Sequence, residues 1–145
     1  MNVTFGLAQT KSKIDYLINE ISKTKNSIEI IETEEADELI GFGHNILPAL
    51  ADFFTDSTIT KVKSECQKRH LTKGEIAIII ADQIQRMPYA LLTGVQNCLF
   101  EFCENNPNWI EYYFPWIKND GFENFEKKYK EWLYSEIRLD FSSKD

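Results

Sequence analysis

The sequence predicts an all-α fold, a single-domain helical bundle of about six or seven helices that spans residues 1–145. Thr72 and Glu75 have the spacing of a capping box, in which each side chain accepts a hydrogen bond from the other residue's backbone amide at a helix start. Residues 76–81 follow as an unbroken apolar run, which favours a helix covered on every side over the alternative, a short buried strand. Elsewhere, apolar residues recur at spacings of three and four, which place them on one helical face.

Two helical segments within residues 73–104 are predicted to form the central hairpin of the bundle, meeting at Met87 and Pro88. Pro88 suits the first turn of the second helix, because its missing amide hydrogen would have no partner there. The apolar residues of this second helix share one face: Leu91, Leu92, Val95, Leu99, Phe102 and Cys103. Such a face is typical of paired helices inside a bundle.

The amino-terminal third of the chain is predicted to add three helices around this hairpin. The first begins at Thr10 or Ser12 and the second at Thr33, while residues 28–31 fit either an extended turn or the entry to the second helix. The third covers residues 44–54. Inward positions are Ile14, Leu17, Ile18 and Ile21 in the first helix and Ile46, Leu47, Leu50, Phe53 and Phe54 in the third.

A short outer helix is predicted for residues 59–70, because residues 56–58, Asp-Ser-Thr, resemble a helix start. Its inward positions would be Ile59, Val62 and Cys66. This helix is mostly polar, so we expect it to lie on the outside of the bundle.

The carboxyl-terminal part is predicted to form an aromatic helix after Pro107 and a last amphipathic helix after the turn at residues 119–121. Pro115 must kink or stop the aromatic helix. The inward residues of the last helix are Phe122, Phe125, Tyr129, Trp132 and Leu133. Residues 142–145 are expected to form a frayed tail.

Composition and charge indicate a folded, acidic protein. Hydrophobic residues make up 43% and aromatic residues 13% of the chain, which argues against disorder. The net charge of −7 would repel nucleic acid and anionic membranes and would attract a basic partner. No apolar run approaches the roughly 20 residues of a membrane span, and no secretory signal is recognisable, so a cytoplasmic location is expected.

The cysteines Cys66, Cys98 and Cys103 are odd in number and form no close metal-binding pair. We therefore expect reduced thiols, no bound metal and no cofactor. Cys98 and Cys103 are more consistent with core packing than with reactivity.

Motifs for catalysis are missing from the sequence, so the protein is not expected to be an enzyme and no catalytic residues are assigned. Asp82 lies in an otherwise apolar helix, and its spacing to Arg86 favours an exposed ion pair. A buried pair would instead mark a candidate site. The alternative function is thus a small helical enzyme or ligand-binding bundle with a pocket near Asp82, Arg86, His44 and Tyr89, or else an oligomeric regulatory protein.

An acidic run precedes and opens the second predicted helix, with six carboxylates and no lysine or arginine: Glu29, Glu32, Glu34, Glu35, Asp37 and Glu38. One interpretation is a solvated first turn, where the helix dipole favours acidic side chains. The other is a surface that contacts a basic partner, formed by Glu32, Glu34, Glu35, Asp37 and Glu38.

Residues 109–116 are the second unusual segment, since they include Trp109, Tyr112, Tyr113, Phe114 and Trp116. One helical face cannot cover all of these rings. Trp109 and Tyr113 or Trp116 are expected to point into the core, and Tyr112 and Phe114 to point elsewhere unless a neighbouring helix covers that side too. Either the whole segment is buried in the bundle, or some rings form a binding surface, where Trp and Tyr are common anchors.

The tyrosine pair and following proline, here Tyr112-Tyr113-Phe114-Pro115, together with acid-rich helices, resemble the bacterial toxin-immunity proteins, in particular the colicin-nuclease immunity bundles. The similarity covers about ten residues, and Phe114 interrupts the Tyr-Tyr-Pro order. It implies a cytoplasmic bacterial inhibitor that binds the basic nuclease domain of a contact-dependent or bacteriocin-type toxin. The partner-binding residues would be Glu32, Glu34, Glu35, Asp37, Glu38, Trp109, Tyr112, Tyr113 and Trp116. Direct binding to nucleic acid or membrane is not expected, and the oligomeric state is left open.

Overall fold

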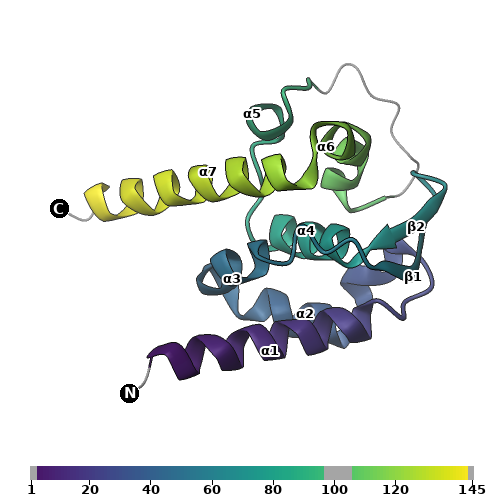
Figure 1. The fold of residues 1–145 in the computed structure, drawn as a ribbon, viewed down its shortest axis with the longest axis horizontal. Coiled ribbons are helices and arrows are strands. Elements are labelled where there is room, and N and C mark those ends of the chain that lie inside the picture. Colours follow the sequence, from purple (N-terminus) through teal and green to yellow (C-terminus); the bar gives the residue numbers. More distant parts are fainter. Residues whose placement is uncertain (1–2, 97–105, 144–145) are drawn as a thin grey trace.

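The computed structural model describes residues 3–96 and 106–143 and is mostly helical, with one small antiparallel sheet (Figure 1). In chain order, with η denoting a 3-10 helix, the elements are α1 (Val3–Ile21), η1 (Ser27–Glu32), α2 (Glu34–Gly41), η2 (Gly43–Ile46), α3 (Leu47–Ala51), β1 (Ile59–Ser64), β2 (Arg69–Thr72), α4 (Lys73–Ile84), α5 (Tyr89–Thr93), η4 (Trp109–Tyr113), α6 (Phe114–Asp120) and α7 (Phe122–Ser143). Helix dominates as predicted, but the all-α assignment was wrong because of the two strands.

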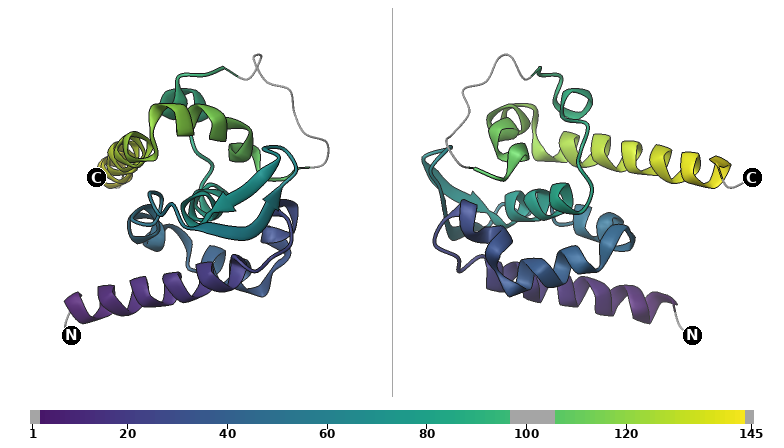
Figure 2. Two further views of the ribbon diagram at one scale, coloured as in Figure 1. Left: turned by 45° about the vertical axis from the view of Figure 1, so that its right-hand side comes forward. Right: turned by 180° about the vertical axis from the view of Figure 1, so that it is seen from behind.

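Helix α4 occupies the middle of the fold (Figures 1 and 2). Helices α1 and α2 lie on one side of it, α6 and α7 lie on the other, and α3 packs near its amino terminus. The outer ends of α1 and α7 project to the same side of the molecule (Figure 2). The first arm of the predicted central hairpin is therefore central, as expected.

The start of α4 is fixed by the predicted capping box. Thr72 Oγ1 accepts from the Glu75 amide at 3.1 Å, and Glu75 Oε1 accepts from the Thr72 amide at 2.9 Å. Arg69 donates to both oxygens of the same carboxylate at 2.8 and 2.6 Å. Gly74 is needed for close packing here, because a Cβ atom at this position would lie 2.2 Å from the Phe54 carbonyl oxygen.

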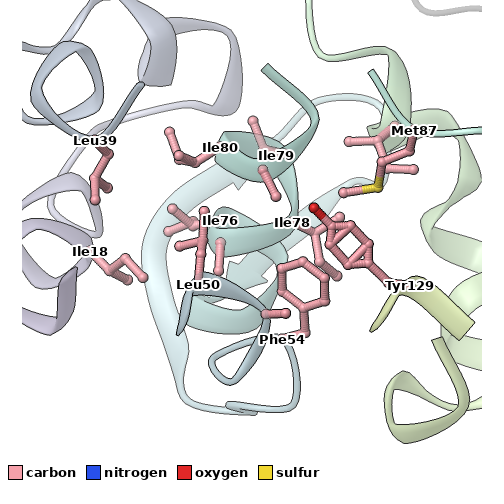
Figure 3. Packing of buried hydrophobic residues seen from close by; sticks show 14 of the residues in the cluster. Ile18, Leu39, Leu50, Phe54, Ile76, Ile78, Ile79, Ile80, Met87 and Tyr129 are labelled. Atoms are coloured by element: carbon pink, nitrogen blue, oxygen red, sulfur yellow. The ribbon is translucent and has the colours of Figure 1, made fainter. Parts of the chain in front are cut away.

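All residues of the 76–81 run are completely buried, as the pattern predicted. Ile76 and Ile80 face Ile18 and Leu39 of α1 and α2, whereas Ile78 faces the Tyr129 ring of α7 (Figure 3). Phe54 and Tyr129 pack with ring centroids 5.0 Å apart. A helix with no exposed face can thus hold two layers of helices together.

Residues 59–70 were predicted as an outer helix, and this was wrong, because they form most of the β1–β2 hairpin. Side chains in β1 alternate, with Thr60, Val62 and Ser64 buried and their neighbours exposed. This period of two fits β-branched residues between lysines better than the helical spacing of Ile59, Val62 and Cys66. Residues 56–58 lead into β1, and Asp56 Oδ1 accepts from the Thr58 amide at 3.0 Å.

The second arm of the predicted hairpin is correct only at its start. Helix α5 ends at Thr93 because Gly94 adopts a left-handed conformation with φ of 75°. Leu92 is buried, but Leu91 is 68% exposed and does not join the core. Leu99, Phe102 and Cys103 lie outside the described residues.

The two ends and the connection at residues 28–31 complete the fold. Helix α1 begins at Val3, earlier than predicted, and residues 28–31 belong to the 3-10 helix η1, which neither alternative specified. The predicted inward residues of the first and last helices are buried or packed against the core. Helix α7 continues to Ser143 and so includes the first two residues of the predicted tail, and residues 144–145 lie outside the described residues.

Cys66 lies in the turn between β1 and β2 and forms a disulfide, so the prediction of three reduced thiols was wrong. The other cysteines, Cys98 and Cys103, lie outside the described residues. Spacing along the chain could not reveal this bond, because disulfide formation depends on distance in space.

Candidate functional site

The acidic run lies on η1 and the first turns of α2. Thr33 caps α2 as predicted, since its Oγ1 accepts from the Ala36 amide at 3.1 Å. Glu32, Glu34, Asp37 and Glu38 are exposed, and Glu35 is half-buried. The cap orients these carboxylates around the positive end of the helix, where the dipole also stabilises them.

Most of this acidic run forms no ion pair with the residues that the structure describes. Among the described residues, Lys13–Glu38 at 3.4 Å is the only ion pair that includes Glu32, Glu34, Glu35, Asp37 or Glu38. Other ion pairs are distributed over the remaining surface, with nitrogen–oxygen distances between 2.6 and 3.8 Å. Unneutralised negative charge is therefore concentrated at the start of α2.

The predicted aromatic helix is divided between Tyr113 and Phe114 into η4 and α6, and Pro115 lies in the first turn of α6. Tyr112, Tyr113 and Phe114 are buried, whereas Trp109 is 51% and Trp116 is 36% exposed. Trp109 is therefore not directed into the core, whereas Tyr112 and Phe114, expected to point elsewhere, lie inside because residues 110–114 are all buried. Of the predicted aromatic binding residues, the surface therefore presents the two tryptophans, while both tyrosines lie inside.

Asp82 is buried, with 1% of its side chain exposed, so the predicted exposed ion pair was wrong. Its Oδ1 accepts from the Met87 amide at 2.8 Å, and its Oδ2 accepts from the Tyr89 hydroxyl at 2.7 Å and from Arg86 Nη1 at 3.2 Å. These bonds close the turn between α4 and α5.

The electrostatic state of this turn follows from its burial. Burial raises the pKa of Asp82, and the Tyr89 hydroxyl, the Met87 amide and Arg86 offset this only in part. Burial also raises the pKa of Tyr89, so that its hydroxyl stays protonated and donates to the carboxylate. Both Asp82 oxygens are already used by protein donors, which suits a structural role.

Arg86 and Trp109 connect this turn to the aromatic segment. The Arg86 guanidinium carbon lies 5.8 Å from the Trp109 ring centroid, in the range of a cation–π contact. Tyr89 and Tyr113 pack with ring centroids 4.7 Å apart. A shallow groove of about 470 Å³ lies alongside, lined by Pro88, Tyr89, Ala90, Leu91, Gln96 and Tyr113.

The alternative function, a small helical enzyme or ligand-binding bundle, needs His44 in a pocket near Asp82. His44 is exposed in η2. Within the described part of the chain, no hydrogen bond, ion pair or ring contact joins it to Asp82, Arg86 or Tyr89. These four residues therefore do not form one contacting cluster.

Glu111 forms a buried polar cluster that the sequence did not indicate. Its carboxylate is completely buried and accepts from Ser64 Oγ at 2.6 Å, from Ser27 Oγ at 3.1 Å and from Asn106 Nδ2. Gln67 Nε2 donates to the Glu111 carbonyl oxygen at 2.8 Å. The cluster joins η1, the β hairpin and η4. Ser64 and Glu111 are 47 residues apart, so no local spacing could have predicted the contact.

Neither metal binding nor membrane insertion is indicated by the described residues. Across 3–96 and 106–143, no group of three or more His, Cys, Asp or Glu side chains is placed to hold a metal ion. In the same ranges, no helix has the length and apolar character needed to span a membrane.

Comparisons of the chain with protein families, with curated proteins and with solved structures find no significant match. Function is therefore inferred from the geometry of the described residues.

Proposed function

We propose that the protein binds and neutralises a basic partner protein, and that it is the immunity protein of a bacterial toxin–immunity pair. The observation that carries this proposal is the unneutralised acidic surface formed by Glu32, Glu34, Glu35 and Asp37. Exposed carboxylates without cationic neighbours are available to a partner, and complementary charge accelerates encounter between proteins.

The two exposed tryptophans, Trp109 and Trp116, supply a second kind of contact. Large rings that lose water on binding carry much of the affinity of protein interfaces, whereas charges at the rim mainly set the association rate. Tyr112 and Tyr113 are buried, so we propose that they hold the segment in place rather than touch the partner.

Binding is proposed in preference to catalysis. Asp82 is the only one of the suggested catalytic groups that is buried, and its two oxygens already accept from Met87, Tyr89 and Arg86. His44 does not contact this group. Among the described residues, no specific contact favours the oligomeric alternative.

A cytoplasmic site of action is part of the proposal, and the Cys66 disulfide is atypical of that compartment. Lysing cells in the presence of an alkylating reagent would show whether Cys66 is reduced or disulfide-bonded in the cell. Full alkylation of three thiols would support the cytoplasmic location. Protection of two thiols would instead place the protein in an oxidising compartment.

Charge reversal tests the acidic surface once a candidate toxin domain is purified. We expect Glu34→Lys with Glu35→Lys to slow association by about tenfold or more at low salt, because favourable steering becomes repulsive. Stopped-flow association at several salt concentrations measures this effect.

The matched control is Glu123→Lys with Glu131→Lys, which makes the same change in net charge on exposed positions of α7. If both double variants slow association equally, only net charge matters and the α2 surface is not the interface. If the toxin domain does not bind the wild-type protein at all, the proposed function is wrong.

Trp109→Ala is expected to act on dissociation instead. Loss of a desolvated ring raises the dissociation rate of the complex, by roughly tenfold or more for an anchor residue, while association changes little. Surface plasmon resonance separates the two rates. An unchanged dissociation rate would exclude Trp109 from the interface.

A further inference from the structure

Helices α1 and α7 both extend beyond α3 on the side of the molecule where the chain ends lie (Figures 1 and 2). At the base of these projecting helices is a cavity of about 290 Å³, distinct from the acidic surface and from the aromatic segment. It is lined by Lys11 of α1, by Pro48, Ala49 and Asp52 at α3, and by Lys130, Leu133 and Tyr134 of α7. Its size is near the lower end of the roughly 300–1,000 Å³ typical of ligand pockets.

Two lysines converge on one carboxylate at the edge of this cavity. Lys11 Nζ lies 2.8 Å from Asp52 Oδ2, and Lys130 Nζ lies 2.6 Å from Asp52 Oδ1. An ammonium has three N–H donors, so both lysines keep donors that Asp52 does not use. Glu126 lies 3.8 Å from Lys130 Nζ but does not line the cavity.

The remaining lining is mainly apolar. Leu133 is almost completely buried, whereas Tyr134, the one member with a polar group, is 69% exposed. Of the charged residues that line the cavity, two are positive and one is negative, on a protein whose net charge is −7. Burial would raise the pKa of Asp52, but Lys11 and Lys130 outweigh burial and lower it, so the carboxylate is ionised and both ammoniums stay nearby.

The ordinary explanation for these two ion pairs is that they hold α1, α3 and α7 together. The three side chains are between 35% and 44% exposed, however, and ion pairs this exposed stabilise a fold by about 1 kcal/mol or less. Ion pairs with a purely structural role also do not require an apolar cavity next to them.

We propose that this cavity binds a medium-chain aliphatic carboxylate, with the carboxylate between the Lys11 and Lys130 ammoniums and the chain against Pro48, Leu133 and Tyr134. The apolar lining selects an aliphatic body, and the spare ammonium donors select an anionic head. In this arrangement Asp52 competes with the ligand for the same donors.

Isothermal titration calorimetry with decanoate, and with decanol as the uncharged counterpart, tests the proposal. We expect one decanoate per chain, and binding of decanol weaker by roughly tenfold, because decanol cannot form the charge-assisted hydrogen bonds. Lys130→Gln should weaken decanoate binding by a similar factor. Lys118→Gln removes the same charge from an exposed position outside the cavity and should have no effect.

Asp52→Asn distinguishes decanoate binding from a purely structural role of the two ion pairs. If Asp52 competes with the ligand, this variant should bind decanoate several-fold more tightly, because both ammoniums lose their anionic partner. Circular dichroism shows whether each variant is folded, and Lys11→Gln, which removes the other ammonium of the cavity, replaces Lys130→Gln if that variant is not.

Three results would overturn the proposal. The first is equal affinity for decanoate and decanol, which would indicate apolar adsorption only. The second is equal weakening by Lys130→Gln and Lys118→Gln. The third is no decanoate binding to the folded wild-type protein. None of these results bears on binding of a basic partner at α2.

Discussion

Carboxylates occupy two contrasting environments in this protein. Glu75, Asp82 and Glu111 are at most 1% exposed, and each accepts at least three hydrogen bonds from donors in the chain. Glu32 and Glu34, in the acidic run, are exposed and have no ion-pair partner among the described residues.

This difference shows that the net charge of −7 combines two populations with different roles. A buried carboxylate needs its donors, and removing one side of such an arrangement leaves polar groups without partners at a high cost in free energy. An exposed carboxylate costs little to change. Substitutions should therefore affect folding at the first population and partner binding at the second.

Glu111→Ala should produce the largest loss of stability. It removes the acceptor shared by Ser27, Ser64 and Asn106 and leaves a cavity, so we expect the free energy of unfolding to fall by roughly 3 kcal/mol or more. Urea denaturation followed by circular dichroism measures this change. Glu111→Gln keeps one acceptor oxygen and should cost less. If Glu111→Ala costs no more than Glu32→Ala, the two populations do not differ as described.

Asp82 should give a smaller effect with a characteristic pH dependence. Its folded pKa is raised above the ordinary value of 3.8, so between these two pKa values the native state holds a proton that the unfolded chain has released. The stabilisation from Asp82 is complete below about pH 3.8 and is lost as the pH rises through the folded pKa.

Asp82→Asn tests this dependence because asparagine does not titrate. We expect the stability of the wild type relative to Asp82→Asn to fall as the pH rises through this window. Denaturation curves of both proteins at several pH values between about 3.5 and 7 measure the difference. A relative stability that rises with pH would mean that the hydrogen bonds to Asp82 outweigh its burial.

Local signals in the sequence predicted the parts of the fold that depend on neighbouring residues. Thr72 and Glu75 cap α4, and Thr33 caps α2, because a capping hydrogen bond spans only three residues. The inward face of α7 was also predicted correctly, since its apolar spacing is regular.

Features that depend on distant contacts were not predicted. The β1–β2 hairpin was read as a helix because Ile59, Val62 and Cys66 happen to have helical spacing. Asp82 and Glu111 can be buried because other residues donate hydrogen bonds to them. Spacing along the chain does not show which residues these are, as with Ser64, which donates to Glu111. Of the predicted partner-binding residues, the acidic run is mainly exposed because it opens a capped surface helix. Tyr112 and Tyr113 belong to a stretch, residues 110–114, that is buried on every side, which spacing along the chain did not predict.

The smallest effects should occur within the acidic run, and they separate its two interpretations. Glu34 is the first residue of α2, so Glu34→Gln should lower stability by about 0.3–1 kcal/mol through loss of a favourable interaction with the helix dipole. Glu32 precedes the Thr33 cap, so Glu32→Gln should change stability by less than about 0.5 kcal/mol. Thermal denaturation at low and high salt measures both, and the Glu34 effect should diminish with salt because the interaction is screened.

If both substitutions slow association with the partner while only Glu34→Gln changes stability, the run serves binding beyond its role in helix capping. If neither slows association, these carboxylates stabilise and solvate α2 only, and the acidic surface is not the interface.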